Sequence, residues 1–103
     1  MSNKKIVKKK QIKTKAKGNR NEKKSIVMME ALGYRCTKSS ASLGLWDFVG
    51  YNRHHWVCVQ VKSNRNPAKM EMDILKEEEV PPNTSKLLHV WVDYARYPEV
   101  TEL

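Results

Sequence analysis

Three polar side chains interrupt two apolar, β-rich segments at positions where a buried strand would carry apolar residues. Asp47 interrupts the first segment, and Gln60 and Lys62 interrupt the second. If the four residues between Tyr51 and Trp56 form a hairpin loop, these two aromatic residues pair across it. Counting back along the pair places Asp47 opposite Gln60, and strand alternation puts Lys62 on the face of Gln60. An acid, an amide and an ammonium are therefore expected to converge.

This combination suits metal-assisted hydrolysis of a phosphodiester bond. Mg²⁺ prefers oxygen ligands such as the Asp47 carboxylate, and it keeps waters that can serve as the nucleophile. The Lys62 ammonium could orient such a water or stabilise charge on the phosphate. Spacing alone leaves a second interpretation open, in which Asp47 and Lys62 form only a salt bridge.

A helix that could add a second carboxylate is expected over residues Asn19–Leu32, with Gly33 as its C-terminal cap. At 100° per residue, Glu22, Ile26 and Met29 share a narrow stripe. A carboxylate thus lies in line with the residues that should face a sheet. Alternatively, Glu22 closes a capping box with the first residue of the helix.

Charge is distributed unevenly along the 103 residues, which suffice for one small domain. The net charge of +9 favours a polyanionic partner, nucleic acid before an anionic membrane surface. Residues 1–17 are predicted to be a flexible lysine-rich arm that contacts phosphates, or else a solubilising tail, and residues 18–103 a single domain. The candidate DNA-binding residues are Lys8, Lys9, Lys10, Lys13, Lys15, Lys17 and Arg20.

The two cysteines and the hydropathy of the chain indicate in which cellular compartment the protein is expected. Cys36 and Cys58 are far apart and lack the spacing of a zinc site, so we expect reduced, buried thiols. No apolar segment approaches the length needed to span a bilayer, and no apolar core of a signal peptide follows the basic start. The expectation is a cytoplasmic protein of a prokaryotic or phage-infected cell, without a membrane partner.

The remaining elements complete a mixed α/β domain in which the first helix packs on a small sheet. A second helix is expected to begin at Pro67, after an Asn66 cap, with Met70 and Ile74 on its inward side. Residues 95–103 give no firm element. The predicted order is helix, three strands, helix, strand, with strands over residues 34–38, 45–49, 56–62 and 86–94.

The order and spacing of several motifs resemble the PD-(D/E)xK nuclease superfamily, and within it the archaeal-type and phage-borne Holliday-junction resolvases. The resemblance covers about residues 18–65, with the strand at 86–94 fitting a later strand of the family. It rests on five motifs: Gly18-Asn19-Arg20-Asn21-Glu22, Leu32-Gly33-Tyr34, the small-residue loop Ser39–Gly44, Trp46-Asp47-Phe48-Val49 and Val59-Gln60-Val61-Lys62.

This resemblance implies a restriction-endonuclease-like core, a homodimer, and cleavage of four-way or other branched DNA with Mg²⁺ or Mn²⁺ in recombination and repair. It also implies roles for individual residues. Glu22, Asp47, Gln60 and the Val61 carbonyl correspond to the metal-binding positions, Lys62 to the catalytic lysine, and Ser39 or Ser42 to a serine near the scissile phosphate.

Gln60 departs from the family pattern, which most often has glutamate at this position. An amide offers a carbonyl oxygen to a hard cation but no charge, so metal affinity should fall unless Glu22 compensates. Two alternatives to a junction resolvase follow: a DNA-binding module on a nuclease-like fold that does not cut, and a nuclease of the same superfamily that acts on other DNA in replication or repair.

Overall fold

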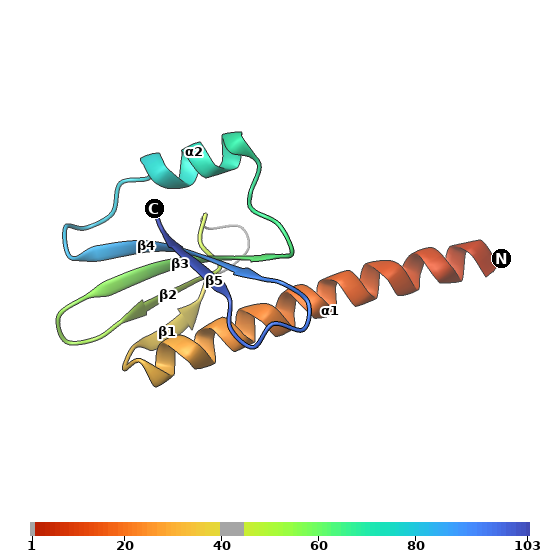
Figure 1. Cartoon of the computed structure of the whole chain (residues 1–103), viewed down its shortest axis with the longest axis horizontal. Coiled ribbons are helices and arrows are strands. Elements are labelled where there is room, and N and C mark those ends of the chain that lie inside the picture. Colours follow the sequence, from red (N-terminus) through yellow and green to blue (C-terminus); the bar gives the residue numbers. More distant parts are fainter. Residues whose placement is uncertain (1, 40–44) are drawn as a thin grey trace.

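The computed structural model describes residues 2–39 and 45–103, with side chains from Lys17 onward, and forms two helices and a five-stranded sheet (Figure 1). No helix in these ranges has the length and apolarity needed to cross a membrane. The elements in chain order are α1 (Ser2–Ala31), β1 (Arg35–Lys38), β2 (Phe48–Tyr51), β3 (Trp56–Ser63), α2 (Lys69–Glu77), β4 (Thr84–Trp91) and β5 (Glu99–Glu102).

The sheet has the spatial order β1-β2-β3-β4-β5 and mixes both pairing senses. Strands β3 and β4 are parallel, and every other pair is antiparallel. The two helices lie on opposite sides of the sheet (Figure 1), so the predicted mixed α/β fold class is confirmed. Strand β5 was not predicted, because its four residues are all exposed at the sheet edge and show no apolar alternation.

The hairpin between β2 and β3 has the predicted register. Tyr51 pairs with Trp56, and their ring centroids lie 5.1 Å apart. The backbone N–H of Asn52 donates to the His55 carbonyl at 2.9 Å, which closes the loop. Because the ladder continues to the β2 residue that directly follows Asp47, the turn fixes which residue stands opposite Asp47.

Alternation along β3 divides the sheet into two differently covered faces. Val57 and Val59 lie on the α1 side, in a core that includes Phe48 and Met29. Burial of such side chains contributes roughly 1.5–3 kcal/mol each relative to full exposure. On the other face, α2 contributes Leu75, which is 1% exposed. Each helix thus covers one face of the central strand pair.

Helix α1 begins far earlier than predicted. Its backbone is helical from Ser2 without a break at Gly18, so the start predicted at Asn19 is wrong and the expected flexible arm is helical backbone in this structure. Lysine has a high helix propensity, which favours a helical backbone in this segment despite the repulsion between its charges. The predicted C-terminal cap is confirmed: Gly33 has a φ of 99°, and the Tyr34 N–H donates to the Met29 carbonyl at 3.1 Å.

Helix α2 is rotated relative to the prediction and starts at Lys69, after Pro67. Met70 is 76% exposed and Ile74 47%, so the inward side assigned to them is wrong, and Leu75 faces the sheet instead. The Lys86 ammonium donates to the carbonyls of the last turn of α2, including that of Leu75 at 3.0 Å. These bonds satisfy carbonyls that a helix end leaves free.

A buried stripe on α1 docks this helix on the sheet. Asn21, Ser25 and Met29 are respectively 5%, 0% and 3% exposed. The Ser25 hydroxyl lies 2.9 Å from His89 Nδ1 and accepts a hydrogen bond from Trp91 Nε1 at 2.8 Å. His89 is thus a hydrogen-bonded histidine of the core.

We expect His89 to make the stability of the protein depend on pH. Burial lowers the pKa of His89 from 6.5 to about 4. Between these values the unfolded chain binds more protons than the folded one, so the free energy of unfolding rises with pH. Relative to a His89→Asn variant, the wild type should lose about 3 kcal/mol as the pH falls from about 7 to about 4.

Denaturant titrations followed by tryptophan fluorescence across this pH range measure the effect. The matched control is His54→Asn, at an exposed histidine of the β2–β3 loop. Parallel pH dependences of the wild type and His89→Asn would contradict the prediction.

Candidate active site

Asp47 is held at the entrance to β2 by two contacts with β3. Its backbone N–H donates to the Val59 carbonyl at 2.9 Å, and its carboxylate accepts a hydrogen bond from the Val61 N–H at 2.7 Å. These contacts flank Gln60 and place Asp47 beside it, as the register predicts. Burial raises the pKa of the Asp47 carboxyl, whereas the Val61 N–H lowers it.

Glu22 approaches the same place from α1. Burial raises the pKa of its carboxyl, and the negative charge of Asp47 raises it further. The Lys38 ammonium, 3.6 Å from Glu22 Oε1, acts in the opposite direction. Asn19 lies inside the helix, so the alternative of a capping box is wrong. Glu22 and Asp47 are therefore neighbouring carboxylates, and the charge of Asp47 destabilises that of Glu22.

Gln60 and Lys62 share the α2 face of β3, as alternation predicts. Gln60 is 8% exposed. The Lys62 ammonium pairs with Glu71 of α2 at 2.8 Å and lowers the pKa of Asp47, whereas Glu71 raises it. The Lys62 ammonium thus stabilises the charged form of Asp47 while it is paired with Glu71, a residue that was not predicted to lie at the site.

Lys38 and Glu71 are the site residues that sequence reasoning missed. Lys38 pairs with the β2 residue after Asp47, so extending the strand register to β1 could have found it. Glu71 precedes Leu75 by four positions and therefore shares its helical face. Glu71 was missed because Met70 and Ile74, rather than Leu75, were predicted to face the sheet.

The donor atoms at this site suit a hard cation. Glu22 and Asp47 supply two close carboxylates with raised pKa values, and Gln60 lies beside them. Mg²⁺ is typically bound by one or two carboxylates and retains several waters. No three acidic, histidine or cysteine side chains within residues 17–39 and 45–103 form a ready metal-binding group. A cation here would therefore depend on neutral oxygen donors in addition to the two acids.

The other predicted residues lie beside this cluster, elsewhere on α1, or outside the described part. Ser39 donates its backbone N–H to the Asp47 carbonyl at 3.0 Å, and Ser42 lies outside the described residues. Lys17 pairs with Asp93 at 2.6 Å, and Arg20 is exposed on α1. The side chains of Lys8, Lys9, Lys10, Lys13 and Lys15 also lie outside the described part.

Comparison with known proteins yields a likeness of fold. No protein-family model and no curated protein sequence matches the chain. Among solved structures, it is similar to Hjc, a Holliday junction resolvase from the archaeal hyperthermophile Archaeoglobus fulgidus, with a TM-score of 0.64 and 16% identity. The chain has a resolvase-like fold. The match covers 84% of this chain and 72% of that chain.

The charge coupling within the site predicts opposite effects of two substitutions on Glu22. Asp47→Asn should lower the pKa of Glu22, because it removes a neighbouring negative charge. Lys38→Met should raise it, because it removes the ion pair. NMR titration of the Glu22 side-chain carboxyl measures both effects.

Glu71→Gln is the matched control for these two variants. It should lower the pKa of Asp47, whose charge Glu71 opposes, and leave that of Glu22 in place. A Glu22 pKa that moves in the same direction in Asp47→Asn and Lys38→Met would contradict the proposed coupling.

Proposed function

We propose that this chain is a metal-dependent DNA endonuclease of the PD-(D/E)xK superfamily that cuts branched DNA, with the four-way Holliday junction as its preferred substrate. The observation that carries the proposal is the meeting of Glu22 from α1 with Asp47, beside Lys62, on a resolvase-like fold. The net charge of +9 supports a polyanionic substrate.

In this proposal, two carboxylates and neutral oxygens hold Mg²⁺ or Mn²⁺. Glu22 and Asp47 supply the charge, and the Gln60 amide and Val61 carbonyl supply neutral donors. Bound metal supplies Lewis-acid stabilisation of the phosphate and an activated water. The Val61 N–H orients the Asp47 carboxylate through their 2.7 Å hydrogen bond.

Lys62 has the role of assisting the attack on the phosphate. Its ammonium can donate to the attacking water or to a phosphate oxygen, where negative charge develops. Glu71 forms an ion pair with this ammonium at 2.8 Å and so limits its orientations before substrate binds. We further propose a homodimer that cuts two strands symmetrically, because one chain provides one such cluster and a four-way junction presents equivalent strands.

Asp47→Asn should abolish cleavage, a loss of at least about 100-fold, because it removes the charge that binds the metal. An asparagine oxygen can still accept the Val61 N–H, so folding and DNA binding should persist. The measurement is a cleavage assay on four-way junction, flap, linear duplex and single-stranded DNA, with and without Mg²⁺.

Asp73→Asn makes the same chemical change at an exposed position of α2 and should leave cleavage unchanged. Cleavage of the junction by Asp47→Asn at the wild-type rate would overturn the assignment. Preferred cleavage of flap or single-stranded DNA would instead favour a nuclease with another substrate.

Gln60→Glu should increase the stabilisation that the protein gains from Mg²⁺ or Mn²⁺. Without a cation, the added carboxylate and Asp47 repel each other. When a cation is present, both carboxylates can bind it. The metal-induced rise in melting temperature should therefore exceed that of the wild type by a few degrees. The control is the same substitution in an Asp47→Asn background, where the metal-induced rise in melting temperature should be smaller. Equal metal-induced rises in the wild type and Gln60→Glu would contradict a role of position 60 in metal binding.

A DNA-binding module that does not cut is the second candidate. It is favoured by the neutral Gln60 and by the engagement of Lys62 with Glu71. This candidate predicts junction binding that Asp47→Asn leaves unchanged and no metal-dependent product from any DNA in the panel.

A further inference from the structure

A cationic pocket lies between α1 and the β4–β5 loop, on the other side of the buried α1 stripe from Glu22. Its volume is about 360 Å³. Three cations from α1 line it, and the loop contributes an acid and an aromatic residue. The lining residues used below are Lys17, Arg20, Asn21, Lys24, Asp93 and Tyr94.

The three cations share one flank of α1 because of their spacing. Lys17, Arg20 and Lys24 are separated by three and four positions, so they follow one another along the same side of the helix. Lys24 also lies over the Trp91 ring, with its ammonium 5.2 Å from the ring centroid. A row of cations at this spacing matches a chain of phosphates better than it matches a single small anion.

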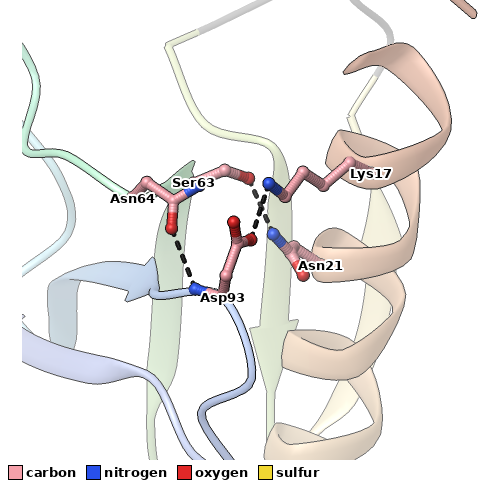
Figure 2. A network of polar contacts seen from close by, with 5 residues as sticks. All are labelled: Lys17, Asn21, Ser63, Asn64 and Asp93. Atoms are coloured by element: carbon pink, nitrogen blue, oxygen red, sulfur yellow. Dashed lines mark hydrogen bonds and ion pairs between the residues drawn. The ribbon is translucent and has the colours of Figure 1, made fainter. Parts of the chain in front are cut away.

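The loop side of the pocket is held in place by polar contacts (Figure 2). The Lys17 ammonium pairs with Asp93 at 2.6 Å, and the backbone N–H of Asp93 donates to the Asn64 side chain at 2.9 Å. In the same network, the Asn21 amide donates to the Ser63 hydroxyl at 2.7 Å. The pocket is therefore built on the fixed ends of β3 and β4.

Tyr94 stands at the pocket in an unusual conformation. Its side chain is fully exposed, with a relative exposure of 106%, and its φ is 67°. A bulky residue rarely adopts this left-handed backbone, and such strain concentrates at functional sites. An exposed aromatic ring beside a row of cations is the combination that binds unpaired nucleotides, through stacking on a base and contacts to the backbone.

The pocket and the candidate active site share two elements, α1 and the end of β3, and alternation along β3 points Lys62 and Ser63 to opposite faces of the sheet. Asn21 directly precedes Glu22, and Ser63 directly follows Lys62. A DNA strand with its scissile phosphate at Asp47 and Lys62 would have to pass the end of β3 to place its neighbouring phosphates at α1.

We propose that this pocket binds the phosphate backbone of the DNA strand adjacent to the cleavage site, with Tyr94 stacking on an unpaired base where the branch opens the duplex. Lys17 exchanges Asp93 for a phosphate when DNA binds, so Asp93 restrains the pocket in the free protein. The inference rests on the proposed function and adds to it Lys24, Tyr94 and Asp93.

Binding of a labelled four-way junction, measured by fluorescence anisotropy in EDTA over a range of salt, tests the pocket separately from cleavage. Lys24→Gln should weaken binding several-fold and reduce the slope of log K against log salt by about one. Lys23→Gln removes the same charge from the exposed neighbouring position, which does not line the pocket, and should have a smaller effect.

Asp93→Asn should strengthen binding several-fold, because it removes the acid that competes with phosphate for Lys17. Its control is Asp73→Asn, at the exposed position on α2. Tyr94→Ala should weaken binding to the junction more than to a fully paired duplex, whereas Tyr97→Ala, at another exposed tyrosine of the same loop, should not discriminate between them.

Equal effects of Lys24→Gln and Lys23→Gln, together with equal effects of Asp93→Asn and Asp73→Asn, would overturn the pocket while leaving the nuclease proposal in place. Loss of binding confined to the pocket variants, in a protein that cuts no DNA, would support the pocket and overturn catalysis. Absence of any DNA binding by the wild type would overturn both.

Discussion

The structure depends on how α1 is rotated about its own axis, and three buried residues set that rotation. Asn21, Ser25 and Met29 recur at intervals of four, so they form one stripe along the helix. Two of them are polar, and burial of an unpaired polar group is costly. Ser25 avoids this cost only in the orientation that reaches His89 and Trp91, and Asn21 only in the orientation that reaches Ser63.

This rotation gives the two flanks of α1 different roles. On one flank, Glu22 reaches Asp47, and burial together with the nearby Asp47 charge raises the pKa of Glu22. On the other flank, Lys17, Arg20 and Lys24 line the pocket beneath the β4–β5 loop. One helix thus carries the proposed cation site on one flank and the proposed phosphate-binding surface on the other, and a turn of that helix about its axis would disrupt both.

Local patterns were enough to predict the centre of the sheet. A four-residue loop flanked by β-rich segments fixes the register of a hairpin, and the alternation of side chains then fixes faces. For this reason Asp47 stands beside Gln60, and Lys62 shares the face of Gln60, as predicted. Gly33 ends α1 as predicted, because the required left-handed conformation suits a residue without a side chain.

The sequence by itself therefore determined the mixed α/β class, the β2–β3 register and the convergence of Asp47 with Gln60. Only the tertiary structure decided which sides of the helices are buried, and with them the positions of Glu71 and Lys24. Hydropathy could not reveal these sides, because the buried stripe of α1 is mostly polar and the inward residue of α2 is Leu75 rather than its neighbour Ile74. Polar residues become buried only where distant parts of the chain supply their hydrogen-bond partners, and those partners are brought close by folding.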